Sequence, residues 1–173
     1  MQYLAIEINE KVKSNTLFEV SSFQSILSSL QSRLLQLNDE LDTPTEQLIC
    51  ITMLVFLTLF FALPGRRIPL GWVARQVPQL YAKGAETAFE RDSVLHAWVV
   101  TTLTISVTNL WAAHVKSGWA EWSKDAWGRV TIDDDWPAFK STLMRVVWIE
   151  SLLDEPAERT FKRMKGGKPL STN

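Results

Sequence analysis

The chain has 173 residues, 46% of them hydrophobic, and a formal net charge of −1 at pH 7. This length and composition fit one globular domain and exclude an intrinsically disordered chain, which would be poorer in apolar residues and more strongly charged. The near-zero charge, with basic residues only in small clusters, gives no support to direct DNA binding. Cys50 is the single cysteine, which excludes an intrachain disulfide and a multi-cysteine zinc site and makes a reducing, intracellular compartment the default expectation.

The first 20 residues predict a poorly defined N-terminal arm, in which Met1–Val12 is either a frayed helix or an extended segment. From Ser21 a helix is predicted, with Ser21 and Gln24 as its capping box. Its apolar residues recur at spacings of three and four, which places them on one face; they are Phe23, Ile26, Leu27, Leu30, Leu34, Leu37 and Leu41. A short hinge and a second helix follow, which predicts an αα-hairpin.

That second helix is the most apolar part of the chain, Leu48–Leu63, without one charged residue. Thr43, Pro44 and Glu46 predict its start as an N-cap, a first-turn proline and the return arm of a capping box, and Pro64-Gly65 predicts its end. As a helix the run reaches about 24 Å, short of the ~30 Å hydrocarbon layer of a membrane. We therefore expect the central helix of a core; the alternative is a single membrane span with Arg66-Arg67 on its cytoplasmic side.

The middle of the chain contains one ambiguous stretch. A short helix is predicted over Leu70–Ala82, kinked at Pro78 and closed by Gly84. Thr102–Thr108 then alternates polar and apolar residues like a strand, yet a longer window that starts at Asp92 or Ser93 fits a helix. Because no second strand is available to pair with it, we expect a helix, with Gly118 as its end.

The remaining elements are also predicted to be helical. A short helix with an aromatic face is expected over Trp119–Trp127, and Asp135 is expected to cap a helix that runs through Phe139 to Leu153. Asp154-Glu155-Pro156 predicts the start of a last helix with Phe161 turned inward, and residues 165–173 a flexible tail. The expected fold is all-α: a single domain over residues 21–164, with about six to eight helices in an irregular bundle around Leu48–Leu63.

Candidate catalytic groups are few. His96 and His114 lie eighteen residues apart on one predicted helix and cannot meet at a metal, and Asp133-Asp134-Asp135 is better explained by helix capping than by a cation site. Lys165-Gly166-Gly167-Lys168 lies in the predicted tail rather than between a strand and a helix, so it does not predict a phosphate loop. No catalytic, cofactor-binding or metal-binding residue is predicted, and an enzyme with a site among the tryptophans of the Trp98–Trp148 region is the weakest hypothesis.

Two stretches together carry a family resemblance: LICITMLVFLTLFFALPGRRIPLGWVARQ and WPAFKSTLMRVVWIESLLDEPAERTF, with the DSVLHAW helix start between them. Over Thr45–Phe161 this order resembles the C-terminal, all-helical regulatory region of fungal zinc-cluster (Zn2Cys6) transcription factors. The zinc-cluster DNA-binding unit of that family needs six cysteines, whereas this chain has only Cys50.

The resemblance implies a regulatory region without its DNA-binding unit. The implied protein is a transcription regulator or co-regulator in the nucleus that acts through protein contacts, with a DNA-binding transcription factor as partner and fungal secondary-metabolite genes as targets. A truncated gene product is a variant of the same interpretation, and oligomers are compatible with it. In the family the apolar helix belongs to a helical core, so the resemblance also favours the core interpretation of Leu48–Leu63.

Overall fold

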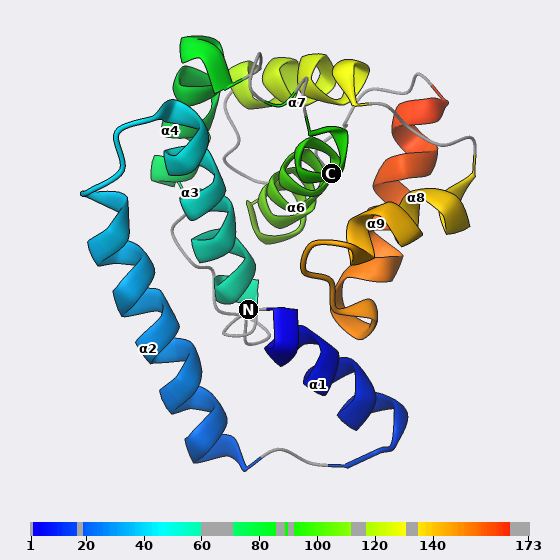
Figure 1. Ribbon diagram of the computed structural model, residues 1–173. Helices are drawn as coiled ribbons and strands as arrows, with labels where there is room; N and C mark the ends of the chain where they lie inside the picture. Colours follow the sequence, from blue (N-terminus) through cyan, green and yellow to red (C-terminus); the bar gives the residue numbers. More distant parts are fainter. Residues whose placement is uncertain are drawn as a thin grey trace.

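The computed structural model describes residues 2–16, 19–59, 71–85, 89, 92–111, 117–130 and 135–166. In these ranges every regular element is helical, which confirms the predicted all-α class (Figure 1). Eight α-helices and one π-helical turn can be followed there: α1 (Gln2–Lys13), α2 (Val20–Asn38), α3 (Pro44–Thr58), α4 (Gly71–Leu80), η2 (Tyr81–Ala85), α6 (Ser93–Trp111), α7 (Ser117–Arg129), α8 (Trp136–Met144) and α9 (Glu150–Lys165).

Two helices, α3 and α6, share the centre of the bundle. Helix α3 packs against α2, α4, η2 and α6, and α6 packs against α3, α7, α8 and α9. The start of α3 is as predicted: Thr43 Oγ1 accepts the amide of Glu46 at 3.2 Å, and the Glu46 carboxylate accepts the Thr43 hydroxyl at 2.7 Å. Cys50 is buried in α3 as expected. The last predicted residues of this helix and its Pro64-Gly65 end lie outside the described ranges.

Helix α6 resolves the ambiguity of Thr102–Thr108 in favour of a helix. Asp92 Oδ1 accepts the amide of Leu95 at 3.0 Å, as an N-cap does. Every side chain from His96 to Ser106 is buried, so the alternation of polar and apolar residues does not mark a solvent-exposed side and a buried side. A buried hydroxyl is tolerated here because the helix backbone can accept it: Ser106 Oγ donates to the Thr102 carbonyl at 2.6 Å.

The ends of three predicted elements differ from the structure. Gly118 does not end α6, because it lies inside α7. The predicted Leu70–Ala82 helix is α4, which continues through Pro78 into the π turn η2 instead of closing at Gly84. Helix α2 begins at Val20 behind Glu19, not at a Ser21 cap; the Ser21 hydroxyl instead donates to the Glu19 carboxylate at 3.1 Å.

The hairpin of α2 and α3 is confirmed, since the two helices pack along each other (Figure 1). The connection between them spans residues 39–43, which is longer than the predicted hinge. Of the two alternatives for the N-terminal segment, the structure shows the helix. Ala5 and Ile8 of α1 belong to the hydrophobic core, and Asn15 with a φ of 52° turns the chain after the helix.

The predicted continuous helix to Leu153 is wrong, because the chain leaves the helical conformation after Met144 and re-enters it at Glu150. Side chains that are distant in the sequence form hydrogen bonds with the backbone groups of this break. The Val147 carbonyl accepts Trp98 Nε1 at 2.6 Å, and the Trp148 carbonyl accepts Asn9 Nδ2 at 2.8 Å. Asn9 Oδ1 in turn accepts the amide of Glu150 at 3.0 Å. Three tertiary hydrogen bonds therefore replace the helical ones.

Helix α9 is a single helix and does not restart at Pro156, which lies inside it. A proline at this position removes the amide that would bond to the Leu152 carbonyl four residues earlier. Helix α9 nevertheless continues through Pro156 to Lys165. Phe161 is buried as predicted, stacked on Phe139 at 5.2 Å between ring centroids, and Asp135 caps α8 as predicted by accepting the amide of Ala138.

Candidate interaction surface

An apolar stripe on α2 is the surface feature that the fold leaves most open. Ile26, Leu30, Arg33 and Leu37 follow one another at spacings of four, three and four, so they lie on one side of the helix. We call these four residues the α2 stripe. Helix α3 covers the neighbouring side of α2, where Leu27 is 1% exposed and the Leu34 carbonyl accepts Cys50 Sγ at 3.2 Å. The predicted apolar face of α2 is thus wider than the surface that α3 covers.

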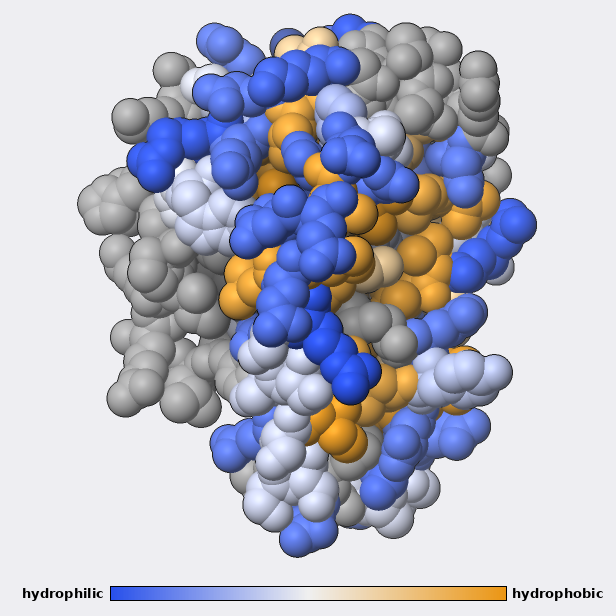
Figure 2. Space-filling view, turned by 60° about the vertical axis from the view of Figure 1, so that its left-hand side comes forward, coloured by the Kyte–Doolittle hydropathy of each residue, from blue (hydrophilic) through white to orange (hydrophobic). Residues whose placement is uncertain are grey.

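Exposure separates the two sides of this face. Ile26 is 48% exposed and Leu37 is 45% exposed, whereas Leu30 is half-buried. Figure 2, turned so that the left-hand side of Figure 1 with α2 comes forward, shows hydrophobic atoms on both sides of a hydrophilic strip that runs down the front. Contiguous exposed apolar residues with polar neighbours are typical of protein-interaction sites.

Charge is concentrated at the two ends of the stripe. Arg33 is the one charged residue between Val20 and Asn38, and the rest of the exposed surface of α2 is mostly serine and glutamine. Glu19 stands directly before the helix, and Asp39 and Glu40 directly after it; all three are exposed. No ion pair of these carboxylates is found within the part of the chain that the structure describes.

A second candidate is the buried aromatic cluster around His96. Its ring lies between Phe89, stacked at 5.3 Å, and Tyr81, stacked at 5.9 Å, and its Nε2 lies 2.8 Å from the Tyr81 hydroxyl. Burial lowers the pKa of His96 to about 4, so the imidazole is neutral near pH 7. Burial also raises the pKa of Tyr81. A neutral imidazole joined to a buried phenol and enclosed by rings is a satisfied core pair rather than an exposed general base.

Four buried polar atoms of α6 and α7 have no hydrogen-bond partner among the described residues: Nε1 of Trp119 and Trp122, and the hydroxyls of Thr101 and Thr102. Trp119 and Trp122 pack on each other at 4.5 Å, and Trp122 meets the edge of Tyr81 at 5.8 Å. Trp119 and Trp122 are thus part of the hydrophobic core. Buried atoms of this kind are commonly satisfied by ordered water.

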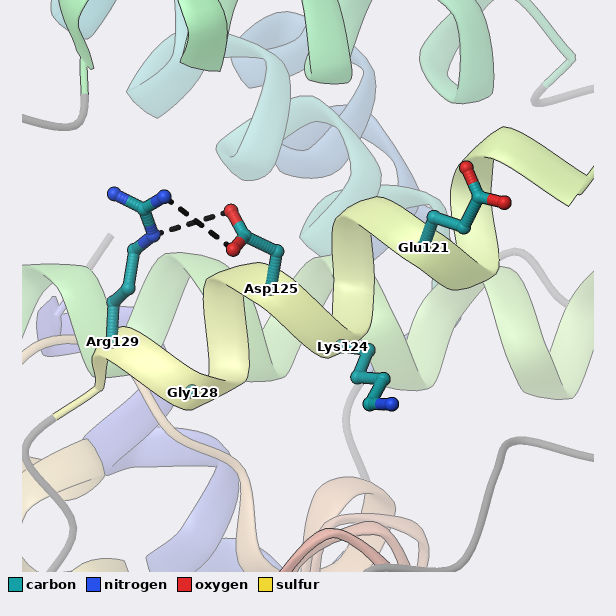
Figure 3. A pocket seen from close by; sticks show the side chains of 5 residues that line it. All are labelled: Glu121, Lys124, Asp125, Gly128 and Arg129. Atoms are coloured by element: carbon teal, nitrogen blue, oxygen red, sulfur yellow. Dashed lines mark hydrogen bonds and ion pairs between the residues drawn. The ribbon is translucent and has the colours of Figure 1, made fainter.

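The outer surface of α7 carries an open hollow (Figure 3). Its described lining consists of exposed residues of this one helix: Glu121, Lys124, Asp125, Gly128 and Arg129. Arg129 pairs with Asp125 one turn earlier, Nε to Oδ2 at 3.2 Å, as the dashed lines show. The pairing of opposite charges on a solvated helix face is ordinary surface chemistry and points to no particular ligand.

A polar cluster around Glu150 joins α1, α8 and α9. Glu150 binds Lys13 at 2.7 Å and Lys140 at 2.8 Å, and Asp154 accepts both Lys140 and Trp148 Nε1. Hydrogen bonds from Lys13 and Lys140 lower the pKa of Glu150. Partial burial lowers the pKa of Lys140, but hydrogen bonds to Asp154 and Glu150 outweigh it and leave that pKa raised. These charges hold the helices together.

The structure describes only some of the residues that the sequence offered as candidates for catalysis or metal binding. His96 is in the core, Asp135 caps α8, and His114, Asp133 and Asp134 lie outside the described ranges. No group of three or more potential metal ligands occurs within the part of the chain that can be described. Ile26 and Leu37 were missed as surface residues, because the spacing that places them on the apolar face of α2 is the same for buried and exposed positions.

The comparisons with known proteins give no relative. No protein-family model, no curated protein and no solved structure matches this chain. Among the helices in the described ranges, none combines the length and the apolar character needed to cross a membrane.

Proposed function

We propose that this chain is a helical protein-interaction module and that it works as a transcription regulator or co-regulator in the nucleus. A DNA-binding partner would supply the recognition of promoter sequence, and fungal secondary-metabolite genes would be the targets. The observation that carries the interaction part is the α2 stripe, with two large apolar side chains about half exposed on one side of a helix. The transcriptional part is supported by the resemblance over Thr45–Phe161.

Deletion of the gene followed by transcript profiling tests the regulatory role. Changed transcript levels for a set of genes are expected, with recovery of the tagged protein in the nuclear fraction. Complementation with Leu37→Glu is expected to fail, whereas Leu35→Glu should restore the transcripts. Leu35 is the matched control, because it is 57% exposed on the same helix but lies two residues from Leu37, roughly 160° around the helix.

Unchanged transcripts for all genes on deletion would refute the regulatory role. If the protein stayed with the membrane fraction after alkaline carbonate washing, the nuclear location would be refuted and the single-span membrane protein would become the favoured alternative. Both measurements use the intact chain, and immunoblotting of each variant checks that it accumulates to the same level.

A further inference from the structure

We propose that the α2 stripe binds an amphipathic helix of another protein, one whose apolar face is flanked at both ends by lysine or arginine. This inference deepens the interaction role proposed above and rests on it. Three features of α2 support it: the order of groups along one side of the helix, the packing of α3 on the neighbouring side, and the distribution of charge.

The first step is the geometry of the stripe. Glu19 precedes Ile26 by seven residues and Leu37 by eighteen, and eighteen residues make five full turns of an α-helix. Glu19, the extended N-cap residue, and Glu40, three residues after Leu37, therefore place one carboxylate at each end of the stripe, whereas Asp39 lies roughly 160° around the helix from Leu37. From Glu19 to Glu40 this is roughly 30 Å of helix, enough for a partner helix of five to six turns.

The second step is that α3 already takes up the neighbouring side of α2 and leaves the stripe in contact with solvent. Leu27 is fully covered while Ile26, the residue beside it, is about half exposed. A partner helix that lies along Ile26, Leu30 and Leu37 would complete a three-helix arrangement with α2 and α3. Helix-in-groove recognition of this kind uses apolar anchors at spacings of three and four.

The third step is charge, which distinguishes the possible occupants. A second copy of this chain would place acidic ends against acidic ends in a parallel pair, Glu19 on Glu19, and in an antiparallel pair, Glu19 on Glu40. Like charges across an interface are unfavourable, so a copy is the poorer occupant. A partner with basic residues at both ends complements these carboxylates, and an acidic residue near its middle complements Arg33.

The test uses a designed probe. A fluorescein-labelled helical peptide of 21 residues carries leucines at spacings of three and four, two lysines at each end and one glutamate opposite Arg33. Fluorescence anisotropy with the full chain should show saturable one-to-one binding. Replacement of the four lysines by glutamates should weaken binding at least about tenfold at low salt, and added salt should reduce that difference.

Protein variants locate the site. Ile26→Glu and Leu37→Glu should each weaken binding of the lysine-flanked peptide by about 10- to 100-fold, because each places a charge in an apolar contact. Leu35→Glu should leave binding unchanged. Urea unfolding of each variant shows that it is folded, which these exposed positions favour.

Several results would overturn the proposal. These are no binding of the probe, equal binding of the glutamate-flanked peptide, or equal effects of Leu35→Glu and Leu37→Glu. A dimer in sedimentation velocity that Leu37→Glu dissociates would show that a second copy takes the stripe. If the probe does not bind but deletion changes transcripts, this inference fails alone; if the probe binds and transcripts do not change, the regulatory role fails alone.

Discussion

Helices α2 and α6 have the same length, 19 residues each, and opposite surroundings. Helix α6 is enclosed by α3, α7, α8 and α9, and even its polar side chains between His96 and Ser106 are buried. Helix α2 packs along α3 and leaves Ile26, Leu35 and Leu37 about half exposed to solvent. This contrast shows that the apolar residues of a helix do not by themselves indicate whether it belongs to the core or to a binding surface. In α6 the apolar side chains are buried and stabilise the fold. On α2, the apolar side chains that α3 leaves uncovered are available for binding.

The largest effect is expected from the centre of α6. Trp98→Ala should lower the free energy of unfolding by about 3–5 kcal/mol, because Trp98 is fully buried and its indole also holds the Val147 carbonyl. Trp98→Phe keeps much of the ring and should cost about 1–3 kcal/mol, since that carbonyl loses its donor. Urea denaturation measures both values, and a Trp98→Phe protein as stable as the parent would contradict the role of the hydrogen bond.

Two neighbouring residues of α2 sharpen the comparison within a single helix. Leu27→Ala should destabilise the fold by about 2–4 kcal/mol, because Leu27 is 1% exposed. Ile26→Ala should cost less than about 1 kcal/mol, because Ile26 already lies half in water. Equal losses of unfolding free energy for the two variants would mean that Ile26 is covered in solution. They would contradict the difference in exposure between the two sides of α2.

The pH dependence of stability tests the burial of His96, a polar side chain of α6. An unfolded histidine takes up a proton near pH 6.5, whereas the folded one does so at about pH 4. Acid therefore favours the unfolded state between these values, and the stability that neutral His96 gives above pH 6.5 is lost as the pH falls toward 4. Between pH 7.5 and 4.5 we expect about 2–3 kcal/mol of loss from this residue.

The control for this titration is His96→Gln, whose side chain does not titrate. Carboxylates also change charge in the same range, so the difference between the two proteins isolates the histidine. Parallel curves of unfolding free energy against pH for parent and variant would show that His96 is not buried in its neutral form.

A change smaller than those at Trp98, Leu27 and His96 is expected in α1. Asn9→Ala removes the two hydrogen bonds that join α1 to Trp148 and Glu150, and should cost about 1–2 kcal/mol. Amide hydrogen exchange of α1 should accelerate more than that of α6. Glu10→Ala, an exposed change in the same helix, serves as the control and should stay within about 0.5 kcal/mol. Equal exchange rates for both variants would contradict the docking role of Asn9.

Two helix starts were predicted correctly from local signals, whereas the Ser21 cap and the ends at Gly84 and Gly118 were not. The capping box of Thr43 and Glu46, and the cap at Asp135, were identified because their partners lie three residues away. The break between α8 and α9 was not, because the groups that stabilise it come from Trp98 and Asn9, which are 49 and 139 residues distant. No local pattern carries that information, and the apolar run Val146-Val147-Trp148 continues a helical spacing smoothly.

The candidate site was predictable in part. The periodicity of α2 indicated which residues share a face, and α3 was the predicted neighbour in the hairpin. Which of those residues α3 covers depends on how the two helices are rotated about their axes, and spacing does not fix that rotation. The exposure of Ile26 and Leu37 therefore needed the structure, as did the burial of His96 against Phe89.

Asn9 also has a consequence for the order of events during synthesis. Its partners at Trp148 and Glu150 are made about 140 residues after it. At roughly 5–20 residues per second, they follow Asn9 by roughly 7–30 s. During that interval α1 has emerged while its docking place does not yet exist, and Ala5 and Ile8 stay without their core. We expect the growing chain to need protection there, for instance by a chaperone that binds short apolar segments near the ribosome exit.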